Sequence, residues 1–239
     1  MMTEVEDAGG RRLRNSLGIQ RRAATVLREL KADPNLGGFV DPALGVPEVF
    51  QGEGEIRLII LGQDPTVKNP RSRLGIKTVL NLDKRGQLRD YLSRICELLG
   101  LNLDEHVYAT NYLKNFFVKP PTQITEIDVF QVFGPNWLPL LQDELALFPR
   151  APVIALGQPL LAALVRGEAS PRVRDYWGYT PRWKSGERGP LDHLAPQDNR
   201  LQRTVFPFPH QPSIRKQFYR ERLASYTAFV RQMAFSGSG

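Results

Sequence analysis

Four short runs of apolar residues stand out along the chain and predict buried strands. They are IRLIILG from Ile56, VYATN from Val107, PVIALG from Pro152 and TVFPFPH from Thr204. Apolar runs of this length without alternation are typical of strands that are covered on both faces, as in parallel sheets. The pattern therefore predicts a central, mainly parallel sheet of four strands.

The segments between these runs carry apolar residues at helical spacing. One stripe runs from Leu88 to Leu99, a second from Leu138 to Phe148, and a third marks a closing amphipathic helix from about Ser213 to Met233. Strands that alternate with helices indicate a parallel sheet with helices packed on its faces. We therefore expect an α/β fold, a three-layer sandwich in which helices flank the four-stranded sheet.

The pattern fits a single domain over residues 1–235. Residues 1–50 are expected to form a helical N-terminal part, because the arginine-rich stretch from Arg11 to Lys31 has near-helical apolar spacing. Prolines and a glycine break residues 170–203 into a long basic and aromatic loop. The last residues, 236–239, read SGSG and are expected to be a flexible tail.

The composition is that of an ordinary globular protein, with 41% hydrophobic and 24% charged residues. No apolar run reaches the roughly 20 residues that span a bilayer, and the first residues lack the apolar stretch of a secretion signal. We therefore expect a cytoplasmic monomer that makes no membrane contact.

Cysteine usage and charge narrow the chemistry further. The single cysteine, Cys96, excludes an internal disulfide, an iron–sulfur cluster and a thiolate zinc site, and its helical context predicts a buried, inert thiol. No residue cluster has the spacing of a metal site, so we expect no metal or other cofactor. The net charge of +7 favours a polyanionic partner such as DNA, although many basic proteins bind no nucleic acid.

Polar residues follow the apolar runs at the points where the predicted strands end. Gln63 and Asp64 follow the first run, Asn111 ends the second, Gly157 closes the third and His210 closes the fourth. In an open parallel sheet, ligands bind beyond the carboxyl ends of the strands. We therefore expect an acid, an amide and an imidazole to share one pocket at that edge.

Asp64 has a competing interpretation as a turn residue. It is followed by proline, and the same Asp-Pro pair occurs at Asp33 and Asp41, where a turn cap explains it. Asp64 differs because it directly follows a buried strand and a glycine that allows a sharp exit. This position favours a functional role.

The amide and imidazole are weak signals when each is taken alone. Asn111 could be a helix cap or a turn residue, and His210 could be a core histidine. The other histidines, His106 and His193, lie in polar or loop sequence and are interpreted as structural or solvated. The functional interpretation depends on the combination with Asp64.

Several strings at the strand ends occur in the order of one family's signatures. LIILGQDPT resembles the first signature of the uracil-DNA glycosylase superfamily, VYATN resembles the strand that bears its base-reading asparagine, and HQPS resembles its His-Pro-Ser loop. VIALGQPLL is similar to the family's strand that ends in glycine and enters a helix. The resemblance covers about Ile56 to Tyr219.

The resemblance implies hydrolysis of an N-glycosidic bond in DNA that contains a damaged base. Asp64 would orient the attacking water and face the sugar cation, and His210 would donate a hydrogen bond to the anion developing on the base. The amide of Asn111 would read the N3–H and O4 edge of uracil, and the backbone after Gln63 would contact the same base. Ser213 would hold a phosphate of single- or double-stranded DNA.

Further DNA contacts are expected on either side of this site. Ile214 is a candidate wedge for the space that a flipped base leaves, with a helix-core role beside Phe218 as the alternative, and Arg215 and Lys216 follow it. In the long loop, we expect nucleic-acid contacts from a set of aromatic and basic residues. These are Tyr176, Trp177, Arg182 and Trp183. The alternative is that the aromatics pin the loop to the protein.

The chain departs from the family pattern in three places. Thr66 stands where familiar uracil enzymes carry a tyrosine that rejects thymine, and LGIKTVLNLD lacks the aromatic residue that stacks on uracil. Gln211 is inserted between His210 and Pro212. These changes leave the excised base open. They also keep two other functions in view, a DNA- or base-binding protein without catalysis and a hydrolase of free nucleosides.

Overall fold

The computed structural model describes residues 18–167 and 170–235, which fall into two compact units. Unit 1 comprises Met1–Glu48, Asp64–Lys77 and Leu113–Leu147, and unit 2 comprises Val49–Gln63, Thr78–Tyr112 and Phe148–Gly239. The single domain over 1–235 stays a prediction. The expectations for residues 1–17 and for the tail 236–239 lie outside the described residues.

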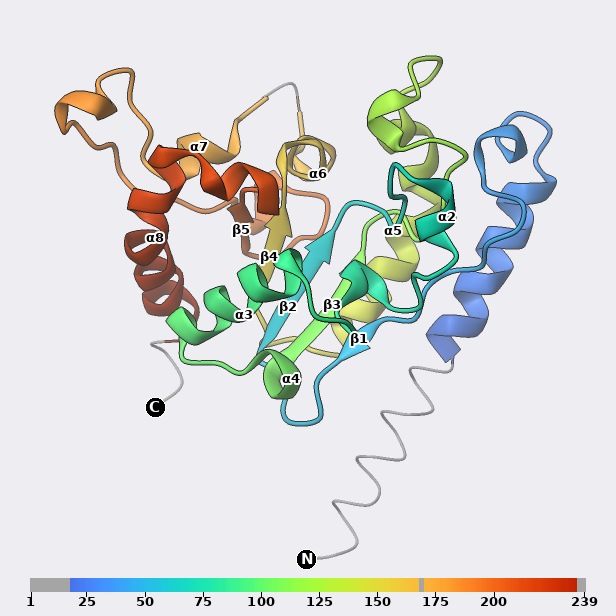
Figure 1. The fold of residues 1–239 in the computed structure, drawn as a ribbon, viewed down its shortest axis with the longest axis horizontal. Helices are drawn as coiled ribbons and strands as arrows, with labels where there is room; N and C mark the ends of the chain where they lie inside the picture. The colour runs from blue at the N-terminus through green and yellow to red at the C-terminus, as the bar shows by residue number, and fades with distance from the viewer. Residues whose placement is uncertain (1–17, 168–169, 236–239) are drawn as a thin grey trace, which may run out of the picture. The chain divides into compact units, whose positions relative to one another are not determined.

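A five-stranded sheet lies in unit 2 and confirms the expected α/β class (Figure 1). Its strands are β1 (Phe50–Gln51), β2 (Leu58–Gly62), β3 (Val107–Asn111), β4 (Val153–Leu156) and β5 (Val205–Phe208). The order is β1-β3-β2-β4-β5, and every pairing is parallel except that of β1 with β3. The four predicted strands are all present and fully buried.

The expected count of four strands is wrong by one, because β1 gives no apolar signal. It has two residues, of which Phe50 is half-buried and Gln51 is exposed. Pairing with the edge of β3 holds it in the sheet, through Phe50 opposite Ala109. A strand this short depends on its neighbour and not on its own sequence.

In the described part of the chain, five α-helices belong to unit 2, and two of them, α3 and α8, match predicted apolar stripes. They are α3 (Gln87–Leu99), α4 (Leu103–His106), α6 (Gln158–Leu164), α7 (Val173–Tyr176) and α8 (Gln217–Phe235). The stripe of α3 is buried at Leu92, Ile95 and Leu99, and the helix ends at Gly100, whose φ of 74° is left-handed. Cys96 is buried in the same helix, and burial raises the pKa of its thiol to about 12. The expected burial of the thiol is confirmed, and its raised pKa disfavours the reactive thiolate.

The closing helix begins later than the sequence pattern predicts. A short 3-10 segment, η6 (Gln211–Arg215), comes first, and α8 runs from Gln217 to Phe235. The expected start at Ser213 is therefore wrong, because Ser213 belongs to the tight turn after β5. The long loop is irregular as expected, apart from α7 and the single turns η4 (Trp183–Ser185) and η5 (Pro196–Asp198).

Unit 1 is built around α5 (Val129–Ala146), the helical residues 18–32 and the short α2 (Pro70–Arg73). The buried indole of Trp137 in α5 donates to Asn115 Oδ1 at 2.8 Å. A buried ion pair joins Lys114 Nζ to Glu144 Oε2 at 2.7 Å. Among the described residues, no helix has the length and apolarity needed to cross a membrane.

Candidate active site

The carboxyl ends of β2 and β3 bring Asn111 against Gly62. These residues are register partners in the parallel pair, and Asn111 is 1% exposed. A Cβ on Gly62 would collide with Asn111 Oδ1 and would lie 2.8 Å from Leu80 Cδ2. Glycine is therefore required at the end of β2, because the amide of Asn111 and the side chain of Leu80 occupy the space above it.

Leu80 was not among the residues predicted from the sequence. Its φ of 58° is left-handed, as is the φ of 54° at the next residue, Asn81. Branched and apolar residues rarely adopt this conformation, which costs on the order of 1 kcal/mol or more. The only sequence signal is that Leu80 lies in LGIKTVLNLD, the stretch that the sequence resemblance aligns with a stacking aromatic residue.

Gln63 and His210 meet over Gly157 at the ends of β2, β4 and β5. Gly157 has a φ of 95°, and a Cβ there would lie 2.7 Å from Gln63 Nε2 and 3.5 Å from His210 Cβ. The left-handed backbone and the crowding both require glycine at this position. Two predicted site residues, far apart in the sequence, are thus neighbours in unit 2.

The segment around His210 is held by hydrogen bonds on both sides. Tyr91 in α3 donates its hydroxyl to Pro209 O at 3.0 Å, and Ser213 N donates to His210 O at 2.7 Å. The inserted Gln211 donates to Gln87 Oε1 at 3.3 Å, so the 3-10 turn accommodates the extra residue. His210 is exposed as a residue. Partial desolvation of its imidazole nevertheless lowers the pKa of this group below 6.5, which favours the neutral form at pH 7.

Asp64 belongs to unit 1 and directly follows Gln63 in the chain. Its Oδ1 accepts a hydrogen bond from Thr66 N at 2.7 Å. Burial raises the pKa of Asp64 from 3.8 to about 6, and the Thr66 hydrogen bonds and the positive charge of Arg73 oppose that rise. A carboxylate that is partly desolvated yet ionised at neutral pH is suited to a base or electrostatic role.

The turn-cap interpretation of Asp64 also holds in the structure. Asp33 Oδ1 accepts from Asn35 N at 2.7 Å, and Asp41 Oδ1 accepts from Ala43 N at 3.1 Å. All three Asp-Pro pairs therefore make the same turn. Asp64 is distinguished by its position after β2 and by its raised pKa.

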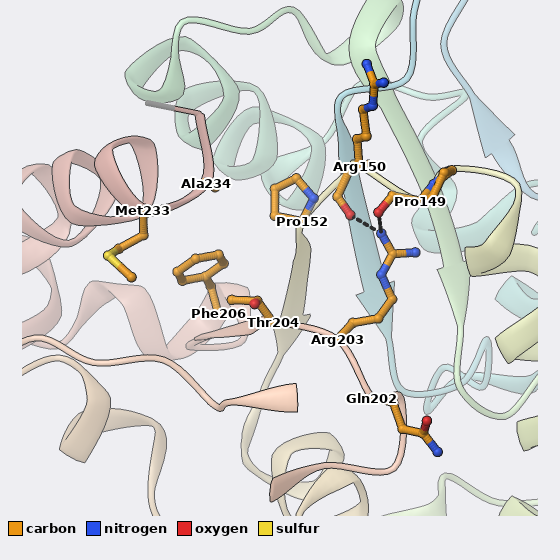
Figure 2. A pocket seen from close by; sticks show the side chains of 10 residues that line it. Pro149, Arg150, Pro152, Gln202, Arg203, Thr204, Phe206, Met233 and Ala234 are labelled. Atoms are coloured by element: carbon orange, nitrogen blue, oxygen red, sulfur yellow. Dashed lines mark hydrogen bonds between the residues drawn. The ribbon is translucent and has the colours of Figure 1, made fainter. Parts of the chain in front are cut away.

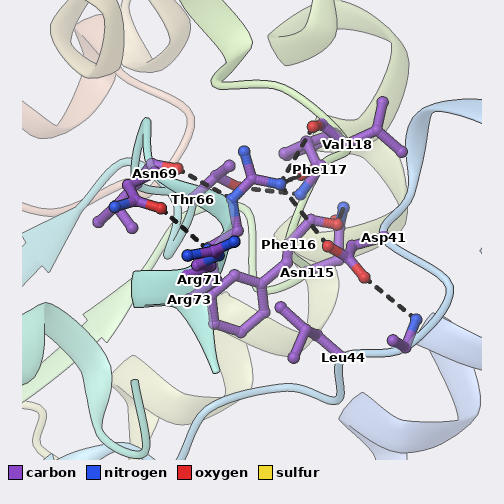
Figure 3. Close-up of polar contacts among 12 residues, drawn as sticks. Asp41, Leu44, Thr66, Asn69, Arg71, Arg73, Asn115, Phe116, Phe117 and Val118 are labelled. Atoms are coloured by element: carbon purple, nitrogen blue, oxygen red, sulfur yellow. Dashed lines mark hydrogen bonds and ion pairs between the residues drawn. The ribbon is translucent and has the colours of Figure 1, made fainter. Parts of the chain in front are cut away.

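Contacts of two residues, Thr66 and Arg73, hold the segment after Asp64 in place within unit 1 (Figure 3). Phe117 N donates to the Thr66 hydroxyl oxygen at 2.8 Å. Arg73 is 3% exposed, donates to the carbonyl oxygens of Val67, Phe117 and Val118, and pairs with Asp41 at 3.6 Å. Thr66 thus helps to anchor this segment.

The structure brings Gln63, Asn111 and His210 to one edge of the sheet in unit 2. Their convergence with Asp64 stays a prediction. The other two histidines have structural surroundings, as expected. His106 Nδ1 accepts from Asn102 N at 2.9 Å, and the ring of His193 packs against Phe206 with centroids 5.8 Å apart.

One expected DNA contact in the long loop is wrong. Trp177 is 0% exposed, stacks on Tyr226 with ring centroids 4.4 Å apart, and donates its indole N–H to Pro207 O at 2.8 Å. It is a core residue that pins the loop to β5 and α8. The pinning alternative therefore holds for Trp177, which DNA cannot reach in this conformation.

The other predicted contacts are more accessible. Tyr176 and Trp183 are half-buried, and Trp183 packs edge-on against Phe218 with centroids 5.5 Å apart. Arg182 is exposed. In the segment after His210, Ser213 and Ile214 are half-buried and Lys216 is exposed. Arg215 Nη2 donates to Gln87 Oε1 at 2.6 Å. Their roles toward DNA stay predictions.

A surface hollow of about 320 Å³ lies in unit 2 at the opposite ends of the strands (Figure 2). It is lined by Pro152 and Phe206 and by the guanidinium of Arg203. Arg203 Nη2 donates to three carbonyl oxygens, those of Phe148, Pro149 and Ala151. Arg203 therefore holds together the segments that precede β4 and β5. The hollow lies at the opposite end of these strands from Gly157 and His210.

Within the described residues, no group of three histidine, cysteine or acidic residues is arranged to hold a metal ion. No protein-family model matches the chain, and no curated protein matches it. The candidate site therefore depends on its own geometry and on the sequence motifs.

Proposed function

We propose that this chain is a DNA glycosylase that hydrolyses the N-glycosidic bond of uracil, or of a related deaminated or damaged base, in DNA. The observation that carries the proposal is the gathering of Gln63, Asn111 and His210 at the carboxyl ends of parallel strands, over glycines that leave no room for side chains. Asp64, with its raised pKa, follows Gln63 in the chain.

The base would be recognised by Asn111 and bounded by Leu80. The Asn111 amide offers an acceptor for N3–H and a donor for O4 of uracil, while cytosine presents the opposite pattern. Its burial and its fit against Gly62 restrict its orientation, and a restricted amide discriminates better than a mobile one. Leu80, which contacts the same glycine, would supply an aliphatic wall where the family uses an aromatic ring.

Bond cleavage would need one group that stabilises the sugar and another that stabilises the departing base. Water attacks the sugar C1′ as the C1′–N bond breaks, the bonding electrons leave with the base, and the water proton is lost. The Asp64 carboxylate would orient the water and stabilise the oxocarbenium-like sugar, and neutral His210 would donate to the base oxygen. One such donor is worth about 3 kcal/mol when it faces developing charge.

A protein that binds flipped bases without cutting them is the second candidate. The observation that favours it is the Asp64 hydrogen bond to Thr66 N, which matches that of the turn aspartate Asp33. Under this alternative, Asp64 only shapes the turn. The two functions differ in whether an abasic site forms.

The deciding experiment incubates oligonucleotides that carry one uracil with the wild type, Asp64→Asn and Asp33→Asn, and then cleaves abasic sites with alkali. We expect Asp64→Asn to slow product formation at least about 100-fold. Asp33→Asn is the matched control, since it changes the same residue type in the same turn, and it should retain the wild-type rate. The wild-type rate should rise with pH through about 6 as Asp64 ionises.

The same assay with hypoxanthine, xanthine, thymine mismatches and alkylated bases identifies the preferred lesion. Absence of product from all of these substrates would refute the glycosylase and favour the binding protein. Equal loss in both aspartate variants would show that the turn matters and not the carboxylate at position 64.

A further inference from the structure

Two segments of unit 2 are rich in positive charge. Residues 172–188 and 215–222 together contain nine lysines and arginines and three acidic residues, a net charge of +6. A local excess of positive charge of this size is typical of a surface that binds a polyanion.

Direct contacts join the two segments into one surface, here called the basic face. Arg188 Nη2 pairs with Glu221 Oε2 at 3.4 Å, and Arg222 Nε donates to Trp177 O at 3.0 Å. Phe218 packs edge-on against rings of the loop at centroid distances of 5.2 and 5.5 Å. The loop is therefore fixed to the start of α8.

The base of the loop is closed tightly. Gly189 N donates to Gly178 O at 3.0 Å. Gly178 has a φ of 72°, and a Cβ there would collide with the carbonyl oxygen of Gly189. The residues between these glycines form a closed tip whose backbone is held at its base, so a partner that binds there would have to order little of the backbone.

The partly buried arginines of the basic face, Arg174 and Arg222, interact with other groups of the protein. Arg174 lies over the ring of Tyr179, with its guanidinium carbon 4.1 Å from the centroid. Burial and the neighbouring charge of Arg188 lower the pKa of Arg222. The positive charges of Arg188 and Arg222 therefore lie close enough to repel one another, and a bound polyanion would reduce this repulsion.

The outer cations are the groups that a partner would meet. Arg182, Lys184, Lys216 and Arg220 are exposed, and none of them forms an ion pair within residues 18–167 and 170–235. Cations without an acidic partner lose little when they bind an anion. They therefore form the part of the basic face that is available for binding.

The chemistry of the basic face favours a polynucleotide over a lipid surface. The large apolar side chains that are exposed in the described structure lie outside both segments, so the face presents no side chain of that kind for insertion into a bilayer. Its second segment is also continuous with η6, which begins directly after His210. A bound strand would therefore run past the residues expected to hold the base.

We propose that the basic face binds the phosphodiester backbone flanking the excised base, through Arg182, Lys184, Lys216 and Arg220. The inference rests on the proposed function for the position of the base. It assigns the binding to the cations of the loop, because the rings of Trp177, Tyr179 and Trp183 pack against residues of α8.

The test measures binding of uracil-free DNA, single- and double-stranded, at several salt concentrations by electrophoretic mobility. Four phosphate contacts predict a slope of log K against log salt of about −3.6 for duplex, and an affinity loss of about 100-fold between 50 and 200 mM salt. The variant R182Q/K184Q/K216Q/R220Q should bind at least about tenfold more weakly at 50 mM and give a nearly flat slope.

The matched control removes four exposed cations elsewhere, in the variant K77Q/R150Q/R166Q/R231Q. It has the same net charge as the test variant and should keep the wild-type slope. Equal slopes in the two variants would overturn the proposal, because only total charge would then matter. Tighter binding to polyglutamate or to vesicles containing phosphatidylserine than to DNA would also overturn it. The same measurement with RNA oligonucleotides distinguishes an RNA backbone from a DNA backbone as the ligand.

Failure of this inference and failure of the proposed function give different results. Uracil excision without salt-dependent binding at the basic face would remove only the inference. Binding that follows the expected slopes, with no excision of any base, would remove only the glycosylase. Asp64→Asn should bind uracil-free DNA as the wild type does.

Discussion

Ionisation of the Asp64 carboxyl group lowers the stability of the folded protein. Burial raises its pKa to about 6, which means that the folded protein disfavours the ionised form present at neutral pH. The hydrogen bond from Thr66 N and the charge of Arg73 offset part of that cost. Such a carboxylate reduces stability while remaining available for chemistry.

Asp64→Asn should therefore stabilise the protein in a pH-dependent way. The folded-state pKa lies above the ordinary 3.8, so the cost of ionisation is absent below 3.8, grows between 3.8 and about 6, and is complete above 6. At pH 7.5, the variant should gain about 1–3 kcal/mol in free energy of unfolding relative to the wild type, and little at pH 4. Urea unfolding at both pH values measures this, with Asp33→Asn as the control. An equal gain at the two pH values would contradict it.

At the scale of elements, the long loop has a buried part around Trp177, here called the anchor, and a tip between Gly178 and Gly189. Trp177 lies in the core against Tyr226, while Trp183 is half-buried at the tip. Gln158 at the start of α6 adds a second attachment, since its Oε1 accepts from Val173 N at 2.9 Å and its Nε2 donates to Pro171 O at 2.8 Å. The loop is irregular in secondary structure but firmly attached.

This division predicts very different costs for the two tryptophans. Trp177→Ala should lower the free energy of unfolding by about 3–5 kcal/mol, because it opens a cavity in the core. Trp183→Ala should lower it by about 1 kcal/mol, as is usual for a partly exposed residue. Urea unfolding of both variants measures the difference. Similar losses would show that the tip contributes as much to stability as the anchor does.

The sequence predicted most elements but not their fine arrangement. The strands β2 to β5 were predictable because burial on both faces leaves a continuous apolar run. Helix α3 was predictable because burial of one face leaves apolar residues at helical spacing. β1 has no such pattern. Leu80 was missed because a left-handed leucine has no sequence signature, and the depth of Trp177 was missed because an anchor and a DNA contact have the same composition.

The candidate site was predictable only in part, for a related reason. Strand ends can be located from the sequence, so Gln63, Asn111 and His210 could be assigned to one edge of the sheet. Side-chain distances across that edge depend on loops such as the turn at Gln211, which apolar periodicity does not describe. The glycines at 62 and 157 mark the closest approaches.

At the scale of the whole molecule, the basic face and the candidate site would have separate tasks. The basic face carries a net charge of +6, and the proposed chemistry needs only a carboxylate, an amide and an imidazole. Association and catalysis would then be separable, with affinity set by salt and the chemical step set by Asp64 and His210. No step in this scheme calls for a Lewis acid.

Excision should accordingly be insensitive to chelators. Under the proposed function, incubation with EDTA is expected to leave the rate of uracil release within about twofold of the untreated protein, because neutral His210 and the Asp64 carboxylate would supply the stabilisation. The measurement is the single-turnover rate before and after dialysis against EDTA. Loss of activity that added Zn²⁺ or Mg²⁺ restores would contradict the prediction.

The three tryptophans occupy separate environments, and this gives the protein built-in optical reporters. Trp137 is buried in unit 1 and donates to Asn115, Trp177 is buried in unit 2 and donates to Pro207, and Trp183 lies on the basic face. Intrinsic fluorescence from single-tryptophan variants would follow the melting of each unit independently. Quenching of Trp183 would report the arrival of nucleic acid without any attached dye.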